Sequence, residues 1–233
     1  MPTLIVVLLC PDLVLYALVG NYCFFCKLYS LQQFIPYHFI LASQSPRRQQ
    51  LLREAGLTFD VIVSHADESY PDDLPVAQIA ELVARAKAHA LRSQIADNTT
   101  IIIAADTTVC LGDVQYGKPY DEFDAIYTLR QLSGRRHQVI TGVCLLSAWG
   151  QHCFSVTTDV AFRTLTPDQI QYYVDTYQPY DKAGAYAIQE WIGLVGIERI
   201  EGCYFNVVGL PVSQLLQELA RFCASSPLGI PEC

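Results

Sequence analysis

Residues 100–109 contain the apolar run that most constrains how this chain can fold. The run reads TIIIAADTTV, with three isoleucines and two alanines in succession before the carboxylate of Asp106. A continuous apolar segment that is rich in β-branched residues is typical of a strand buried on both faces. We therefore expect it to form the central strand of a sheet that helices cover on both sides.

Strand and helix patterns alternate along the rest of the chain from residue 38 onward. Residues 76–94 give the clearest helix pattern, because Ile79, Leu82 and Val83 recur at the spacing of one helix face. Strands are expected at residues 38–42, 59–63, 138–147 and 152–165, with further helices at residues 43–54, 121–132, 166–177 and 211–222. Short strands are expected up to Gly202, and residues 204–211 are expected to be a strand that enters the last helix. This order favours an α/β fold: a mixed twisted sheet with flanking helices, and two lobes around a cleft.

The first 36 residues differ in composition from everything that follows. Residues 4–25 are almost entirely apolar and long enough to span a bilayer, although Pro11, Asp12 and Asn21 interrupt them. Three interpretations stay open: a membrane anchor, an additional buried helix, or a translation start placed upstream of the native one. Any membrane association would have to come through this segment, because the rest of the sequence offers no other route. The predicted organisation is an N-terminal extension at residues 1–36, one domain at residues 37–224 and a C-terminal tail at residues 225–233.

The balance of charges limits the partners that this chain can bind. It has 15 basic and 23 acidic residues, which gives a formal net charge of −8. Nucleic-acid binding relies on a basic surface that neutralises phosphates, so we expect no nucleic-acid partner. An anionic small molecule can still bind where a few cations converge in one cleft. The nine cysteines lack the spacing of a disulfide framework, so we expect reduced thiols in a cytoplasmic protein.

A possible anion site directly follows the first predicted strand. Ser43 is placed to cap the next helix, Pro46 falls in its first turn, and Arg47 and Arg48 follow. Backbone N–H groups at a helix N-terminus attract anions, and arginine adds bidentate phosphate donors. The simpler alternative is an ordinary helix cap followed by two solvated arginines.

Asp106 is the acidic residue whose position best suits a catalytic or metal-binding role. It is expected at the end of the apolar strand, and open α/β sheets bind their ligands at the carboxyl ends of strands. A carboxylate at such a site can hold a divalent metal or accept a proton from water. The alternative is a structural aspartate that caps the turn after the strand.

Two further blocks bring cations and an amide. Gly112 and Gly117-Lys118 give the spacing of a phosphate-binding P-loop, but Pro119 stands where that motif requires Ser or Thr, so we reject a P-loop. Lys118 remains a candidate phosphate contact. In the later block KAGAYAIQ, Lys182 adds a cation, Gly184 permits close backbone approach, and Gln189 adds an amide that can read a base edge.

Taken in order, five blocks resemble the Maf family of nucleotide pyrophosphatases. They read SQSPRR, ADT, GKP, KAGAYAIQ and YFNVVGLP, and the similarity runs from His38 to Phe222. The resemblance implies a mixed α/β fold with an elongated cleft, similar to that of the inosine-triphosphate pyrophosphatases, in a protein that forms homodimers. It also implies that a nucleoside triphosphate is hydrolysed to the monophosphate and pyrophosphate, with a divalent cation, Mg²⁺ or Mn²⁺, as cofactor.

Roles for individual residues also follow from the resemblance. It implies that Asp106 is the catalytic proton acceptor. The implied specificity residues are Arg47, Thr107 and Gln189, the phosphate contacts are Ser43, Arg48, Lys87, Lys118 and Lys182, and the metal ligands are Glu68 and Asp106. The Ile-Gln ending of KAGAYAIQ looks like the branch of the family that acts on dTTP and UTP. Glu190 and Trp191 follow Gln189 in this chain, where many members carry glycine.

Two other functions stay open beside the dTTP/UTP pyrophosphatase. One is a 7-methyl-GTP pyrophosphatase, the activity of a sister branch of the family. The other is a regulator of cell division or septum formation that binds nucleotides without significant catalysis. The intact set of lysines, arginines and acidic residues favours an active enzyme over an inactive regulator.

Overall fold

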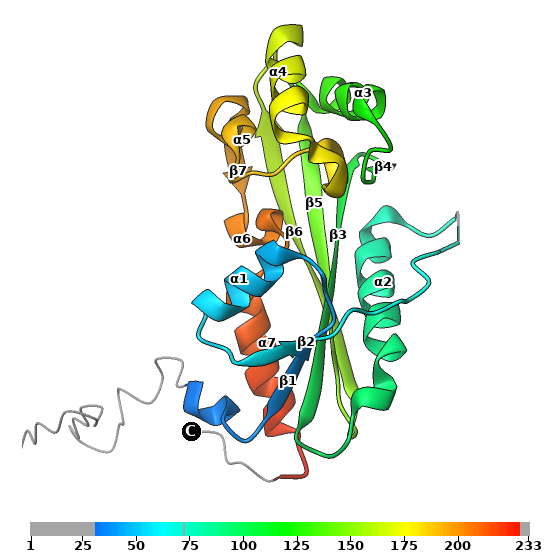
Figure 1. Cartoon of the computed structure of the whole chain (residues 1–233), viewed down its shortest axis with the longest axis vertical. Coiled ribbons are helices and arrows are strands. Elements are labelled where there is room, and N and C mark those ends of the chain that lie inside the picture. Colours follow the sequence, from blue (N-terminus) through cyan, green and yellow to red (C-terminus); the bar gives the residue numbers. More distant parts are fainter. Residues whose placement is uncertain (1–30, 72, 229–233) are drawn as a thin grey trace, which may run out of the picture.

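The computed structural model describes residues 31–71 and 73–228 (Figure 1). The apolar segment at residues 4–25 lies outside the described residues, so its three interpretations stay predictions. The described strands are β1 (His38–Leu41), β2 (Phe59–Val61), β3 (Thr100–Leu111), β4 (Val114–Tyr116), β5 (Arg136–Leu146), β6 (Gln151–Phe162) and β7 (Ile197–Glu201). The described α-helices are α1 (Pro46–Glu54), α2 (Val76–Ala90), α3 (Glu122–Leu132), α4 (Pro167–Tyr177), α5 (Trp191–Gly196), α6 (Tyr204–Val208) and α7 (Val212–Ala224).

The seven strands of the described chain form one mixed sheet. Its order is β2-β1-β3-β5-β6-β7, and β4 pairs with the end of β3. β1 runs parallel to β2 and β3, whereas β5, β6 and β7 are antiparallel to their neighbours. Residues 101–105 of β3 are completely buried, which confirms the prediction of a central strand.

Helices cover both faces of the sheet in its lower half (Figure 1). On one face, Leu52 from α1 and Leu219 from α7 join one apolar cluster with Ile101 from β3. On the other face, Ala84 from α2 packs in a cluster with Ile102. Neighbouring side chains of β3 thus point into different cores, as the two-residue period of a strand requires.

The approach of α2 to the sheet depends on one glycine of β5. A Cβ atom at Gly142 would lie 2.3 Å from backbone atoms of Ala80 and Glu81. That distance is shorter than any tolerable contact, so only glycine lets the helix backbone lie directly on the strand.

A third cluster forms the upper lobe of the molecule. Leu129 from α3, Tyr173 from α4 and Ile192 from α5 pack with Val160 from the upper end of β6. The long strands β3, β5 and β6 run through both lobes and join them (Figure 1). The structure therefore confirms the predicted α/β class, a mixed sheet with flanking helices in two lobes.

Several predicted boundaries are wrong. Asp106 does not end its strand, because β3 continues to Leu111 by pairing with β5. The block expected to be a strand at residues 204–211 forms the short helix α6, and residues 191–196 form α5 rather than a strand. The helix expected over residues 76–94 ends at Ala90, and a separate 3-10 turn follows it.

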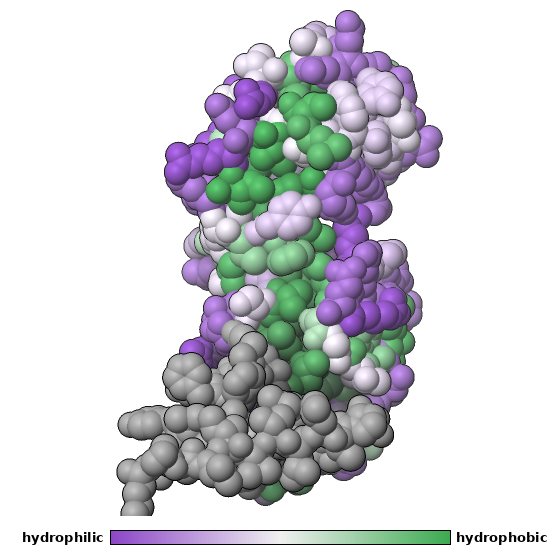
Figure 2. Space-filling view, turned by 90° about the vertical axis from the view of Figure 1, so that its left-hand side faces the viewer, coloured by the Kyte–Doolittle hydropathy of each residue, from purple (hydrophilic) through white to green (hydrophobic). Residues whose placement is uncertain are grey.

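One side of the molecule carries a band of hydrophobic surface (Figure 2). This is the side on which α1, α5, α6 and α7 lie in Figure 1. Leu194 of α5 is 84% exposed, and Tyr204 and Phe205 of α6 are 41% and 47% exposed. No helix among the described residues has the length and apolar character that crossing a membrane requires.

Candidate active site

A pocket of about 390 Å³ lies where the two lobes meet. Residues from the loop after β1, from β3, from α2, from the loop after α4 and from the end of α6 line it. Its charged side chains are Arg47, Arg48, Lys87, Lys118, Lys182, Glu68, Asp106 and Asp181. Five are basic and three acidic, so the pocket has a local excess of positive charge in a chain whose net charge is −8. Such a pocket attracts anions.

The wall of the pocket is a stretch of β3 whose edge β1 leaves open. β1 ends at Leu41, which pairs with Ile103, so β3 continues without that neighbour. Arg48 takes the place of the missing strand: its Nη1 donates to the carbonyl oxygen of Ala105 at 2.9 Å. Its Nε donates to the carbonyl of Gly209 at 2.8 Å, and its Nη2 donates to Thr107 Oγ1 at 2.8 Å.

Arg48 therefore organises the site as well as lining it. Its Nη1 also lies 3.4 Å from Ser43 Oγ, so one guanidinium joins three separate segments of the chain. Burial lowers the pKa of Arg48, and the charge of Asp106 opposes that shift. Four of its five N–H donors are engaged with protein acceptors, which leaves little donor capacity for a ligand.

The N-terminus of α1 faces the same pocket. Ser45, not the predicted Ser43, is the N-cap, and its side chain accepts from the backbone N–H of Arg48. Pro46 occupies the first turn, as predicted. Ser43 is buried, and its Oγ accepts from the N–H of Ser45 at 3.2 Å.

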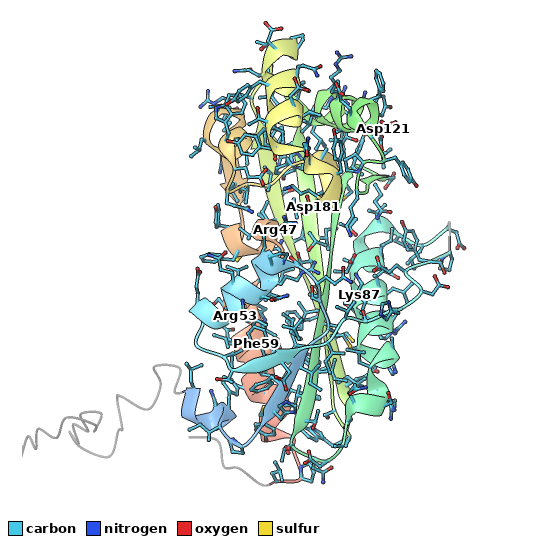
Figure 3. All side chains as sticks on the ribbon, viewed as in Figure 1. Arg47, Arg53, Phe59, Lys87, Asp121 and Asp181 are labelled. Carbon is cyan, nitrogen blue, oxygen red and sulfur yellow. The ribbon has the colours of Figure 1, made fainter. Side chains whose placement is uncertain are left out.

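Lys87 of α2 lies between two carboxylates. Its Nζ is 2.7 Å from Asp106 Oδ1 and 3.1 Å from Glu68 Oε1 (Figure 3 places Lys87 between α2 and the sheet). The side chains of Lys87 and Asp106 are 12% and 20% exposed, whereas that of Glu68 is 56% exposed. Because one ammonium reaches both, the carboxylates of Glu68 and Asp106 converge on a common region of the pocket.

That convergence fits a divalent cation that shares its ligands with a phosphate. Magnesium is usually held by one or two carboxylates together with water and substrate oxygens. Among residues 31–71 and 73–228, no group of three or more His, Cys, Asp or Glu side chains is arranged to hold a metal ion. Glu68 and Asp106 match the two-carboxylate pattern, not a cage made entirely of protein ligands.

Two glycines bring the remaining lysines to the pocket. The N–H of Gly184 donates to the carbonyl of Gly117 at 3.0 Å, which joins the loop of Lys118 to that of Lys182. Gly184 has a φ of +70°, and a Cβ there would lie 2.8 Å from the side chain of Val109. The predicted need for close approach at Gly184 is confirmed.

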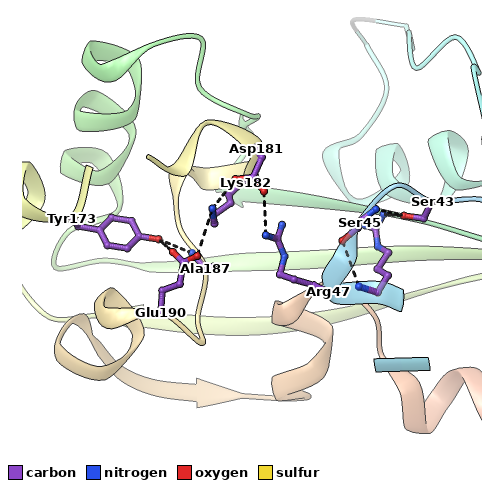
Figure 4. Close-up of polar contacts among 9 residues, drawn as sticks. Ser43, Ser45, Arg47, Tyr173, Asp181, Lys182, Ala187 and Glu190 are labelled. Carbon is purple, nitrogen blue, oxygen red and sulfur yellow. Dashed lines mark hydrogen bonds and ion pairs between the residues drawn. The ribbon is translucent and has the colours of Figure 1, made fainter. Parts of the chain in front are cut away.

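Asp181 connects the two lobes across the pocket. Its Oδ2 accepts from Arg47 of α1 at 3.2 Å, and its Oδ1 accepts from Lys182 at 2.6 Å (Figures 3 and 4). Burial raises the pKa of Asp181, but the hydrogen bond and charge of Lys182, together with the charge of Arg47, outweigh burial and lower it. Asp181 thus provides an anion for two cations of the pocket.

All ten residues singled out from the sequence line this one pocket. They are Ser43, Arg47, Arg48, Glu68, Lys87, Asp106, Thr107, Lys118, Lys182 and Gln189. Thr107 accepts from Arg48, and its hydroxyl lies 3.0 Å from that of Thr141, whereas Gln189 lies exposed at the rim. Asp181 was not among the predicted site residues, although its position beside Lys182 could have indicated a role.

Comparison with known proteins agrees with this geometry. The Maf family, described as Maf-like protein, matches residues 38–222. A dTTP/UTP pyrophosphatase of Bacteroides fragilis is 50% identical over 186 residues, which cover 79% of this chain and 96% of the relative. One from Parabacteroides distasonis is 46% identical over 193 residues, which cover 82% of this chain and 100% of the relative.

A solved structure, that of the Staphylococcus aureus Ham1 protein, is 15% identical in sequence. The alignment covers 79% of this chain and 99% of that chain, with a TM-score of 0.47. The family match extends from β1 through most of α7 and contains every residue of the pocket. On this match and on the identity to both pyrophosphatases, the chain belongs to the Maf family.

Proposed function

We propose that this protein is a nucleoside triphosphate pyrophosphatase that hydrolyses dTTP and UTP to the monophosphate and pyrophosphate. The observation that carries the proposal is the pocket itself, which brings four further cations together with the Asp106–Lys87–Glu68 cluster. The relatives named dTTP/UTP pyrophosphatase, which share up to 50% identity with the chain, support the same reaction. The enzyme is thus a hydrolase of acid anhydrides.

The cations act on the triphosphate. Arg47, Lys118 and Lys182 come from both lobes, so they would contact bound phosphates from two sides. Ser43 adds a hydroxyl at the start of α1, where backbone N–H groups also favour an anion. Arg48, whose donors are mostly engaged within the protein, adds its positive charge and its one remaining N–H. Positioning and charge neutralisation supply most of the rate enhancement in phosphoryl chemistry.

Asp106 is the proposed proton acceptor for the attacking water. Its second oxygen, Oδ2, is not the one that Lys87 holds, so the ion pair orients the carboxylate without using all of its accepting capacity. Attack on the α phosphorus then releases pyrophosphate. Lys87 is positioned by both carboxylates and stabilises negative charge that develops beside them.

Glu68 and Asp106 are the proposed ligands of a divalent cation, Mg²⁺ or Mn²⁺. When bound, such an ion neutralises phosphate charge and stabilises the departing pyrophosphate. The convergence of the two carboxylates on Lys87 supports this assignment.

Base selection is assigned to residues at the rim and wall. Gln189 offers both an amide donor and an acceptor, Thr107 lies on β3, and Arg47 reaches across from α1. A site built to pair with polar base edges discriminates strongly, because the wrong base leaves polar groups unpaired.

A substrate screen tests the proposal directly. The protein is incubated with the common nucleoside triphosphates and 7-methyl-GTP in Mg²⁺ or Mn²⁺, and pyrophosphate and orthophosphate are quantified separately. We expect pyrophosphate from dTTP and UTP. Preferred turnover of 7-methyl-GTP would identify the sister activity, and nucleotide binding without turnover would identify a regulator of cell division.

We further propose a cytoplasmic homodimer whose catalytic domain is residues 37–224. The family match at residues 38–222 supports the domain limits, and the free thiols of the described cysteines suit a reducing compartment. The exposed apolar side chains Leu194, Tyr204 and Phe205 are of the kind that subunit interfaces bury. Light scattering and cell fractionation test both statements.

A further inference from the structure

Glu190 is placed between the two kinds of substrate contact in the proposed site. It follows Gln189 directly and stands at the start of α5. One carboxylate oxygen, Oε2, accepts a hydrogen bond from the hydroxyl of Tyr173, and the other, Oε1, lies 3.5 Å from Lys182 Nζ (Figure 4). The Glu190 side chain therefore contacts both Tyr173, which holds the turn that carries Gln189, and Lys182, a proposed phosphate contact.

Tyr173 supports this arrangement through two hydrogen bonds of its hydroxyl. It comes from α4, its side chain is completely buried, and its hydroxyl accepts from the backbone N–H of Ala187 at 3.1 Å. Burial raises the pKa of Tyr173, and the hydrogen bond to Glu190 adds to the shift, so the phenol keeps its proton and remains a donor.

The turn that carries Gln189 is closed twice by these contacts. The N–H of Glu190 donates to the carbonyl of Ala187 at 3.1 Å, which closes the backbone turn. The Tyr173 hydroxyl joins the N–H of Ala187 to the side chain of Glu190, which closes it a second time. Gln189 lies inside this turn, so its direction toward the pocket depends on both closures.

The same carboxylate lies beside a buried cation. Lys182 has a side chain that is only 9% exposed, and its partners are Asp181 at 2.6 Å and Glu190 at 3.5 Å. The Glu190 side chain is 22% exposed against 61% for Asp181, so water screens the charge of Glu190 less. Its negative charge partly offsets the attraction of Lys182 for a phosphate.

We propose that Glu190 is a positioning residue for base specificity, which holds the Gln189 turn through Tyr173 and moderates phosphate affinity through Lys182. This inference rests on the proposed function, in which Gln189 reads the base and Lys182 contacts phosphate. The hydrogen bond of Glu190 acts on base specificity and its charge acts on phosphate affinity, so two different substitutions can distinguish the two effects.

Glu190→Gln keeps an oxygen that accepts from Tyr173 but removes the charge. We expect its preference for dTTP over dGTP, the ratio of kcat/KM values, to stay within about two-fold of wild type. Its KM for dTTP should fall by roughly two- to five-fold, the effect of about 0.5–1 kcal/mol for a partly exposed ion pair. Glu198→Gln, an exposed glutamate of β7, is the matched control and should change neither value.

Glu190→Ala removes the acceptor as well. The preference for dTTP should then fall by roughly five-fold, since one net hydrogen bond contributes about 1 kcal/mol. Tyr173→Phe should lower it similarly, with thermal unfolding used to verify that this variant is folded. A folded Glu190→Ala protein with wild-type preference, or a Glu190→Gln protein that loses as much preference as Glu190→Ala, would overturn the inference.

The preference for dTTP over dGTP is also measured in binding, as the ratio of the dissociation constants of their α,β-methylene analogues. A wild-type protein that binds dTTP selectively but releases no pyrophosphate would refute the proposed reaction, while the binding ratios of the variants would still decide the role of Glu190. A wild-type protein that binds no nucleotide would overturn both proposals.

Discussion

Arg48→Lys tests whether the guanidinium organises the site or mainly binds phosphate. Arg48 makes four hydrogen bonds that join the loop after β1, the open edge of β3 and the end of α6. A lysine keeps the positive charge, but its three donors radiate from one point and cannot reproduce the planar fork. At least two of the four contacts should therefore be lost.

The expected cost follows from those contacts. A hydrogen bond that involves a charged group contributes about 1.5–3 kcal/mol, so the loss of two lowers the free energy of unfolding by about 3–6 kcal/mol. For a domain of this size, Tm should fall by roughly 10 °C. Urea unfolding followed by tryptophan fluorescence measures the change.

Arg47→Lys provides the matched control one residue earlier. Arg47 pairs with Asp181, whose side chain is 61% exposed, so this substitution should change stability by no more than about 1 kcal/mol. Its effect should instead appear in the preference among bases. If Arg48→Lys were as stable as Arg47→Lys and lost only nucleotide affinity, the organising role of Arg48 would be refuted.

Three further outcomes are expected. Gln189→Ala should weaken discrimination between bases more than overall turnover, by about 1–3 kcal/mol, and equal losses in kcat/KM for all nucleotides would contradict a base contact. Gly142→Ala should lower the free energy of unfolding by about 1–3 kcal/mol because its Cβ would strike α2, whereas Gly150→Ala, with nothing within 4 Å, should be neutral in the same urea titration. Burial lowers the pKa of His137 to about 4 from its usual 6.5, so the unfolded chain binds the extra proton first and stability should fall by about 3 kcal/mol as the pH drops from 6.5 to 4. Urea titrations at several pH values in that range should show that the free energy of unfolding depends less steeply on pH in His137→Asn. An unchanged pH dependence would count against the buried neutral imidazole.

The central strand and the membership of the pocket were predictable because their signals are local. Three consecutive isoleucines have few alternatives to a buried strand, and four of the five cations of the pocket lie in short blocks with their own patterns. The fifth, Lys87, lies in the predicted helix and was assigned by the family resemblance alone. The blocks are far apart in sequence, so their meeting in one pocket depends on the fold; the family resemblance supplied that information.

The misjudged elements depend on contacts that no local pattern reveals. Residues 204–208 read YFNVV, whose aromatic and β-branched side chains favour a strand. They form α6 because Asn206 is buried there and its amide donates to the carbonyl of Val139 and to the hydroxyl of Thr158. Tertiary hydrogen bonds thus outweigh the local preference.

The position of Asp106 was misjudged for a related reason. The change from apolar residues to Asp106-Thr107-Thr108 resembles the end of a strand, yet β5 continues the pairing to Cys110. What ends near this point is the neighbour β1, so the polar residues face an open edge within the strand. Asp106 therefore stands on a continuous strand and not on a terminal loop.

Hydrolysis of dTTP in water enriched with ¹⁸O tests the central claim most directly. With Mg²⁺ or Mn²⁺ present, the products are separated and the label is located by mass spectrometry, for wild type and for Asp106→Asn. We predict one ¹⁸O atom in the nucleoside monophosphate, unlabelled pyrophosphate, and a loss of rate of about 10²–10⁴-fold in the variant. Label in the pyrophosphate, release of orthophosphate, or full activity without the Asp106 carboxylate would contradict it.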